Sequence, residues 1–258
     1  MIRGIARKYF EGKTCIFCNK YGLYKLADKQ VKCKHCNKHY SIRKLKRDLQ
    51  ILYYFYLEIS ARKTAKELEL DYQIVQSRFM QFRKCIADYC NTEAKKLNGK
   101  IEIDESYFGG KRKGQRGRGA KNKTIVFGIL ERKGKIYTKI VENVSAETLM
   151  SEIKNKTLKG SVFYTDGWKS YASLHQFGKH NIIDHDKELV DENHNHINGI
   201  EGFWSFAKER FHKYHGIDKQ NYPFYVKEME FRFNHRNESI FNLLFDICVR
   251  RVSSTDFH

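Results

Sequence analysis

The stretch Ile101–Tyr107, IEIDESY, followed by Phe108-Gly109-Gly110, decides the fold. Isoleucines alternate with acids, which is the two-residue period of a strand with one buried face. That period places Glu102 and Asp104 on the side opposite the two isoleucines. Asp104 lies near the end of the strand, just before a turn, and a carboxylate on a rigid strand is suited to holding a divalent metal.

Two further strands and a helix follow this stretch. Residues 124–131 (TIVFGILE) and 135–141 (KIYTKIV) flank a short turn, so they predict an antiparallel hairpin that pairs with the opening strand. Ser145 is then expected to cap a helix.

Residues 161–168, SVFYTDGW, predict a buried strand that ends at Asp166. Three antiparallel strands, a helix and a strand ending in an acid are the opening order of an RNase H-like fold, in which the first and fourth strands are neighbours. Asp166 would then approach Asp104. The alternative is that Asp166 only starts a turn, as Asp-Gly pairs often do.

Residues 196–211, HINGIEGFWSFAKERF, have apolar positions at helical spacing. Glu201 and Lys208 are seven residues apart, so they share a different face of this helix, and Asn198 lies one turn before Glu201. One interpretation is an ordinary solvated face. The other is a third metal ligand followed, two turns later, by a cation for a phosphate.

Upstream, four cysteines form two C-x2-C pairs with fourteen residues between them, Cys15, Cys18, Cys33 and Cys36. Four thiolates close a tetrahedral zinc site with no open position, which predicts a zinc ribbon with a structural ion. Redox-active or free thiols are the alternative.

Residues 41–89 have helical periodicity throughout. A short helix within 60–70 and a longer one from Tyr72, capped by Asp71, predict a helix-turn-helix. Gln73, Gln76 and Arg78 would lie on or near its exposed face and contact DNA. An ordinary helical bundle has the same period.

Residues 109–123 contain seven basic residues and five glycines, and they cannot pack a core. We interpret them as a cationic loop beside the metal site that closes on phosphates, and the alternative is a solvated hairpin tip. Its predicted DNA contacts are Lys111, Arg112, Lys113, Arg116, Arg118, Lys121 and Lys123.

The composition favours a polyanionic partner. The 258 residues include 49 Lys and Arg against 30 Asp and Glu, a net charge of +19. That excess, with 18 Phe and 16 Tyr, is typical of nucleic-acid binding. Because no apolar run is long enough to span a bilayer and the cysteines suit a reducing compartment, we expect an intracellular protein without a membrane partner.

Three blocks of the sequence resemble the catalytic blocks of a group of small insertion-sequence transposases: 104–107 (DESY), 164–168 (YTDGW) and 198–205 (NGIEGFWS). Members of this group carry an N-terminal zinc ribbon and a DDE catalytic domain and are related to the Merlin transposons. The resemblance covers nearly the whole chain in the expected order. The three blocks together are specific for this group, whereas each block alone is a weak indication of it.

The resemblance implies an acidic triad of Asp104, Asp166 and Glu201 that binds Mg²⁺ or Mn²⁺, with Lys208 as the basic residue. Some members of the group use Asn as the third residue, so Asn198 competes with Glu201. We prefer Glu201, because a carboxylate binds a hard cation better than an amide does.

The expected architecture is an α+β multidomain protein with a zinc ribbon (1–42), a helix-turn-helix module (43–97) and a retroviral-integrase-like RNase H domain with C-terminal helices (98–258). The expected activity is that of a DNA transposase, which cuts at terminal inverted repeats and joins the freed 3′-OH to target DNA. It would act as a homodimer or larger oligomer in the bacterial cytoplasm or nucleoid, or in the nucleus for a eukaryotic element. A metal-dependent nuclease or resolvase, or an inactive DNA-binding regulator, are the alternatives.

Overall fold

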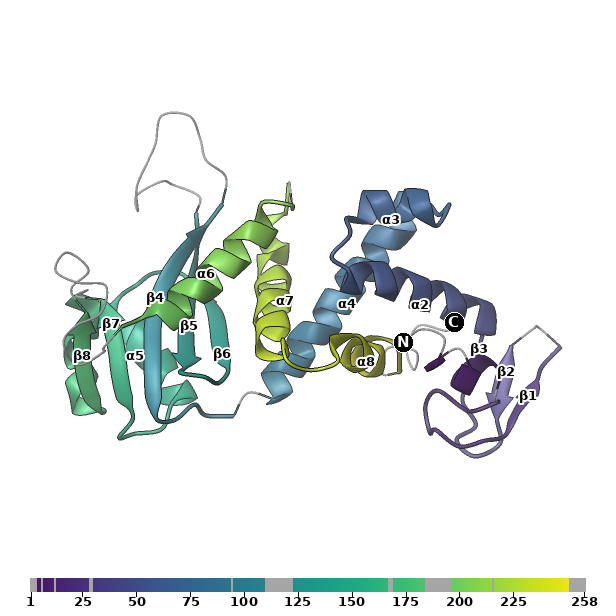
Figure 1. The fold of residues 1–258 in the computed structure, drawn as a ribbon, viewed down its shortest axis with the longest axis horizontal. Coiled ribbons are helices and arrows are strands. Elements are labelled where there is room, and N and C mark those ends of the chain that lie inside the picture. The colour runs from purple at the N-terminus through teal and green to yellow at the C-terminus, as the bar shows by residue number, and fades with distance from the viewer. Residues whose placement is uncertain are drawn as a thin grey trace. The chain divides into compact units, whose positions relative to one another are not determined.

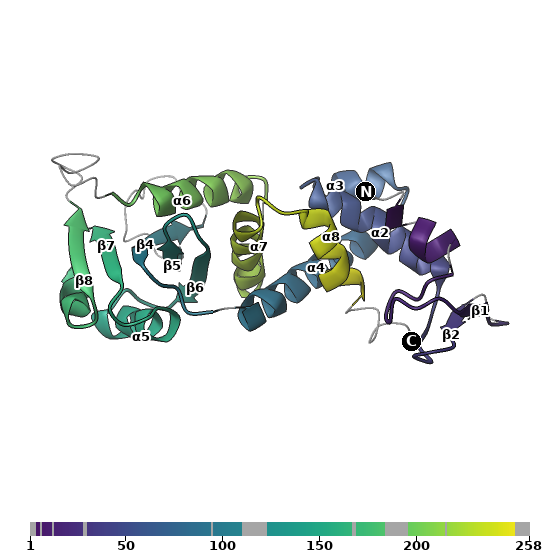
Figure 2. The ribbon, with the colours of Figure 1, turned by 60° about the horizontal axis from the view of Figure 1, so that its bottom comes forward.

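The computed structural model describes residues 4–5, 7–11, 13–27, 30–93, 95–109, 123–166, 169–183, 196–214 and 216–250. The chain forms two compact units (Figures 1 and 2). The first consists of Met1–Tyr89 together with His235–His258, and the second of Cys90–Asn234. In the described parts of the chain, none of the helices is both long and apolar enough to cross a membrane.

The first unit begins with the predicted ribbon. Its antiparallel sheet has the order β1 (Leu23–Lys25), β2 (Val31–Cys33) and β3 (His39–Tyr40). The first two strands pair with each other as an antiparallel hairpin. The third was not predicted, because two residues are too few for a periodic pattern.

Three helices follow the ribbon, α2 (Ile42–Tyr56), α3 (Ala61–Glu67) and α4 (Tyr72–Glu93). The hydroxyl of Ser60 accepts a hydrogen bond from the Lys63 N–H at the start of α3. The carboxylate of Asp71 accepts one from the Gln73 N–H at 2.7 Å, so this residue caps α4 as predicted. The short helix, four-residue turn and long helix of the sequence prediction are therefore present.

The last helical segments, α8 (Ile240–Leu244) and a π-helical turn over Phe245–Arg250, pack in the first unit. The Phe241 ring, which is fully buried, lies 5.9 Å from the ring of Tyr53 on α2. The Arg250 Nε donates to the Ile16 carbonyl at 2.7 Å. This differs from the predicted division, which assigned residues up to 258 to the catalytic domain. The difference arises because the partners of these side chains come from distant parts of the sequence.

The second unit is built on a five-stranded sheet with the order β6-β5-β4-β7-β8. The predicted antiparallel hairpin pairs with β4, and β7 and β8 run parallel to β4. This order and these directions are those of an RNase H-like fold, so the predicted fold class is confirmed. The fifth strand was not predicted. The strands are β4 (Lys100–Phe108), β5 (Thr124–Glu131), β6 (Ile136–Val141), β7 (Val162–Asp166) and β8 (Lys179–Ile183).

Both faces of the sheet are covered by helix (Figure 2). On one face Ile101 and Ile103 pack with α5 (Ala146–Lys156), whose N-terminus is capped by Ser145 as predicted. On the other face α6 (Asn198–Phe211) packs its apolar stripe on the sheet. The strand period therefore directs Glu102 and Asp104 towards α6, as the sequence predicted.

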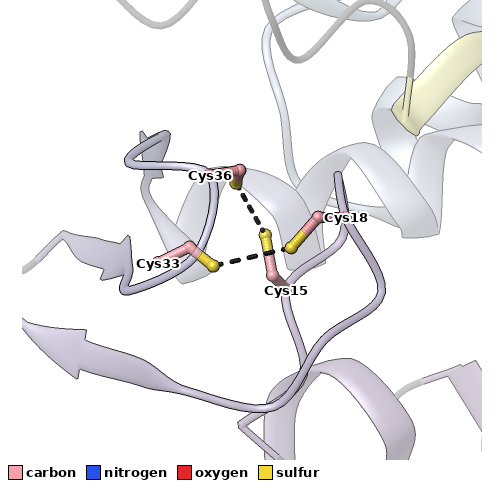
Figure 3. A group of neighbouring side chains, drawn as sticks. All are labelled: Cys15, Cys18, Cys33 and Cys36. Carbon is pink, nitrogen blue, oxygen red and sulfur yellow. Dashed lines mark hydrogen bonds between the residues drawn. The ribbon is translucent and has the colours of Figure 1, made fainter.

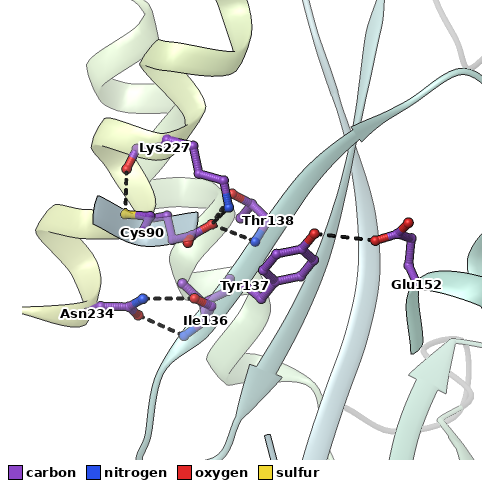
Figure 4. A network of polar contacts seen from close by, with 8 residues as sticks. Cys90, Ile136, Tyr137, Thr138, Glu152, Lys227 and Asn234 are labelled. Carbon is purple, nitrogen blue, oxygen red and sulfur yellow. Dashed lines mark hydrogen bonds and ion pairs between the residues drawn. The ribbon is translucent and has the colours of Figure 1, made fainter. Parts of the chain in front are cut away.

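The helix α7 (Tyr222–Asn234) covers the edge strand β6 and bonds its outward backbone groups (Figure 4). The Asn234 amide accepts from the Ile136 N–H at 2.7 Å and donates to the Ile136 carbonyl at 2.8 Å. The Glu230 carboxylate accepts from the Thr138 N–H at 2.7 Å. An edge whose N–H and C=O groups are bonded cannot pair with another strand, so α7 closes this side of the sheet.

Candidate active site and metal centre

The carboxylate of Asp104 is held by a tryptophan from the facing helix. The indole Nε1 of Trp204 on α6 donates to Asp104 Oδ2 at 3.0 Å. Asp104 is opposite Gly128 in the β4–β5 register. A Cβ at Gly128 would lie 2.7 Å from the Trp204 ring, so a glycine is needed here for the indole to reach the acid.

The negative charges of Asp166 and Glu201 act on the carboxyl of Asp104, so the three acids of the predicted triad interact electrostatically. The pKa of the Asp104 carboxyl is raised to about 6. Burial is the main cause and the negative charges of Asp166 and Glu201 add to it, while hydrogen bonds from the Glu105 N–H and the Trp204 indole act in the opposite direction. A cation placed among these carboxylates would offset their mutual repulsion.

The three acids do not form a closed ligand cluster. Among the described residues, the four cysteines are the only group of three or more His, Cys, Asp or Glu residues whose ligand atoms all lie within 4.8 Å of one another. The carboxylates of Asp104, Asp166 and Glu201 would therefore have to draw closer together around an ion.

Asp166 is the last residue of β7 and is half-buried. β7 runs parallel to β4, with Tyr164 opposite Glu102. Asp166 thus lies two residues beyond this pair, as Asp104 does on β4. The predicted neighbourhood of the first and fourth strands is present.

The other candidates of the third block lie on α6. Glu201 is half-buried in the first turn of this helix. Asn198 is exposed at the first residue, and Lys208 is exposed two turns after Glu201. The negative charge of Glu201 contributes to the raised pKa of Asp104. The choice of Glu201 over Asn198 as the third ligand stays a prediction.

Two acids that flank Asp104 already have protein partners. Glu102 is fully buried and accepts from the Arg132 Nε at 2.8 Å. Glu105 points to the opposite face, where the buried Tyr171 hydroxyl donates to it at 2.6 Å. Both contacts disfavour these acids as alternatives to Asp104.

The predicted DNA contacts divide between described and undescribed parts of the chain. Lys123 precedes β5 and is half-buried. The other residues of the cationic loop lie outside the described residues: Lys111, Arg112, Lys113, Arg116, Arg118 and Lys121.

On α4, Gln73 is exposed and Gln76 is half-buried. The guanidinium of Arg78 already pairs with an acid of the protein, since its Nε lies 3.2 Å from a carboxylate oxygen of the buried Asp48 on α2. Gln73 and Arg78 line an open hollow of about 740 Å³, together with Arg47 and Lys84. The basic lining of this hollow suits a phosphate backbone. Asp48 was missed by sequence reasoning, because a single acid in a helix gives no signal.

The four cysteines of the ribbon converge on one point (Figure 3). The sulfur of Cys15 lies 3.7 Å from that of Cys36, and the sulfur of Cys18 lies 3.6 Å from that of Cys33. Burial raises the pKa of the Cys33 thiol, but hydrogen bonds from the backbone N–H groups of Cys36 and of His35 bring it down to about 6. The arrangement fits one tetrahedral Zn²⁺.

Comparison with known proteins identifies the family. Residues 96–234, more than half of the chain, match the ISXO2-like transposase domain. The chain belongs to the ISXO2-like transposase family. The match ends at Asn234, which is also where the second compact unit ends. The predicted relationship to insertion-sequence transposases is confirmed.

Relatives of this transposase-family chain occur in bacteria and archaea. It is 43% identical over 105 residues to an uncharacterised transposase-like protein of Haemophilus influenzae, covering 40% of this chain and 84% of that protein. It is 24% identical to an uncharacterised protein in the transposable element ISH50 of Halobacterium salinarum, covering 87% of this chain and 86% of that protein.

Solved structures similar to this transposase-family chain include integrases and transposases. One is the catalytic core domain of HTLV-2 integrase in complex with magnesium, at 10% identity and a TM-score of 0.35, covering 60% of this chain and 99% of that one. Another is the Mos1 transposase paired-end complex with the left transposon end, at 14% identity and a TM-score of 0.28, covering 85% of this chain and 80% of that one.

Proposed function

We propose that this family member is a metal-dependent DNA transposase that cleaves at terminal inverted repeats and joins the freed 3′-OH to target DNA. The observation that carries the proposal is the electrostatic coupling of Asp104 to Asp166 and Glu201 across three separate elements. Carboxylates from distant segments that together raise the pKa of Asp104 form a site that a divalent cation stabilises.

In the proposed reaction, Asp104, Asp166 and Glu201 hold Mg²⁺ or Mn²⁺. Bound divalent ions would activate a water or a 3′-hydroxyl and stabilise the leaving oxygen of a phosphodiester. The Trp204 indole keeps the Asp104 carboxylate oriented and favours its charged form. Lys208, two turns after Glu201, supplies a positive charge to the DNA phosphate.

The partner is proposed to be double-stranded DNA. The four cysteines hold one structural Zn²⁺, and the ribbon and the α3–α4 pair grip the inverted repeats through the basic residues of this unit. Pairing two transposon ends requires at least a dimer.

Cleavage of DNA carrying the ends of the element that encodes this chain tests the proposal. We expect Asp104→Asn, Asp166→Asn and Glu201→Gln each to lower the Mn²⁺-dependent cleavage rate by about 100-fold or more, because each variant removes one metal-binding charge. Glu147→Gln, on the exposed start of α5, is the matched control and should cleave normally.

Normal cleavage by all three variants would rule out this metal site. Asn198→Ala, measured beside Glu201→Gln, decides the third ligand. Supplying DNA with pre-cleaved ends separates the alternatives, because a transposase joins them to target DNA whereas a nuclease or resolvase of the same fold does not.

A further inference from the structure

The N-terminus of α6 is capped by an acid from another element. Ile197 occupies the cap position and has no polar side chain to offer the first N–H groups of the helix. The Oε2 of Glu102, on β4, accepts from the Ile200 N–H at 2.9 Å. A negative charge at this end of a helix is also favoured by the helix dipole. Glu102 thus ties α6 to β4.

The buried charge of Glu102 is balanced by Arg132. The Arg132 Nε donates to Glu102 Oε1 at 2.8 Å, and the Arg132 Nη2 donates to the carbonyl oxygen of His196 just before α6. The guanidinium lies over the ring of Tyr164, with its carbon 3.7 Å from the ring centroid. Tyr164 is on β7, so one acid–arginine pair contacts β4, β7 and the start of α6.

Each contact of this network is adjacent to a proposed metal ligand. Glu102 precedes Asp104 by two residues on β4, and Tyr164 precedes Asp166 by two residues on β7. The third proposed acid is the residue that follows Ile200 on α6. The network therefore contacts a residue one or two positions before each of the three carboxylates along the chain.

The start of α6 packs closely against the carboxylate of Glu102. A Cβ on Gly199 would lie 2.8 Å from Glu102 Oε2 and 2.7 Å from a methyl group of Leu130. The glycine lets the start of α6 approach the buried carboxylate. A buried ion pair contributes little net stability compared with apolar residues, so fixing the geometry is the better explanation for its presence here.

We propose that Glu102 is a positioning residue that, through Arg132 and the Ile200 N–H, sets the distances among the three metal-binding carboxylates. This role rests on the proposed function. Glu102 itself binds no metal and touches no substrate. Partners behind metal ligands of this kind usually change metal affinity by about 10- to 100-fold.

Metal binding, measured separately from cleavage, tests the proposal. We expect Glu102→Gln to weaken Mn²⁺ binding to the full-length protein by about 10-fold or more, and to raise by a similar factor the Mn²⁺ concentration needed for half-maximal cleavage. Excess Mn²⁺ should restore most of the cleavage rate. Exchange of the Ile200 amide hydrogen should become faster, because its acceptor loses its charge.

Two further variants distinguish a specific effect on Mn²⁺ binding from a general loss of folding. Arg132→Lys keeps the positive charge beside Glu102 but loses the guanidinium contact with the Tyr164 ring, so we expect a smaller loss of Mn²⁺ affinity with normal folding. Glu131→Gln, on the neighbouring strand β5, is the matched control and should bind Mn²⁺ normally.

Folded Glu102→Gln and Arg132→Lys proteins with unchanged Mn²⁺ affinity would overturn the positioning role. Asp104→Ala, measured beside them, separates this failure from a failure of the proposed function. If Asp104→Ala abolishes Mn²⁺ binding and Glu102→Gln leaves it intact, only the positioning role is wrong. If Asp104→Ala also leaves Mn²⁺ binding intact, both the proposed metal site and the positioning role of Glu102 are wrong.

Discussion

The side chain of Asp104 lies between an indole that favours its charged form and two carboxylates that oppose it. The Trp204 contact depends on Gly128, because any larger residue opposite Asp104 would occupy the position of the indole ring. The hydrogen bond from Trp204 and the absence of a side chain at Gly128 therefore orient Asp104, the central candidate of the site.

The raised pKa of Asp104 predicts a pH dependence of metal binding. Below pH 6 the carboxyl holds a proton that a metal must displace, so Mn²⁺ affinity should fall about tenfold for each pH unit below about 6 and level off above it. Calorimetric titration between pH 5 and pH 8 measures this. A flat affinity across this range would contradict the raised pKa.

The same raised pKa has the opposite effect on the pH dependence of folding stability. In the metal-free protein, an unfolded Asp titrates near 3.9, so the native state holds its proton to higher pH. Its contribution to stability is present at low pH and is lost as the pH rises from about 4 to about 6. Trp204→Phe, which removes a donor to the carboxylate, should raise the pKa of Asp104 and shift both profiles to higher pH.

At the scale of single elements, α7 replaces a neighbouring strand along β6. Asn234 bonds both backbone groups of Ile136, and Glu230 bonds the backbone and the hydroxyl of Thr138. The buried Glu230 is balanced by Lys227, whose Nζ lies 2.7 Å from it. These contacts bind a helix to a strand edge by hydrogen bonds as well as by apolar packing.

Substitution of Glu230 should destabilise the second unit. We expect Glu230→Ala to lower the free energy of unfolding by about 3 kcal/mol, because it leaves the Thr138 N–H without its acceptor and Lys227 without its counter-charge. Urea titration measures the change. Glu209→Ala, on the exposed side of α6, is the control and should change the free energy of unfolding by about 0.5 kcal/mol or less. Equal effects of the two substitutions would contradict the edge-covering role.

At the scale of the whole molecule, the chain leaves the first unit after Tyr89 and returns to it at His235. The returning segment buries Phe241 against Tyr53 and Tyr56 of α2, with ring centroids 5.9 Å and 5.5 Å apart. The first unit is thus discontinuous in sequence, and its core needs residues from both ends of the described chain.

Phe241→Ala tests this division. Truncating a fully buried phenylalanine should cost about 3–5 kcal/mol. We expect amide hydrogen exchange to become faster in α2 and α4, while exchange in β4 and β5 stays as in the unaltered protein. Faster exchange in β4 and β5 instead would show that this segment stabilises the second unit.

Local periodicity predicted most of the elements. The alternation of residues 101–107 predicted β4 and the face of Asp104, and the two C-x2-C pairs predicted the ribbon and its four converging thiols. β3 was missed because its two residues are too few for a period, and β8 was missed because its residues, KHNII, do not alternate apolar with polar side chains. The roles of Glu102 and Glu105 were missed as well, because their partners lie on other elements.

The sequence by itself determined the fold class, the ribbon with its four converging cysteines and the neighbouring strands that carry Asp104 and Asp166, because each follows from the spacing or the order of segments along the chain. Only the tertiary structure decided that Trp204 orients Asp104, that Glu102 caps α6 and that the C-terminal helices join the first unit. Those contacts are between side chains roughly 100 or more residues apart, and no local pattern encodes which distant surfaces pack together.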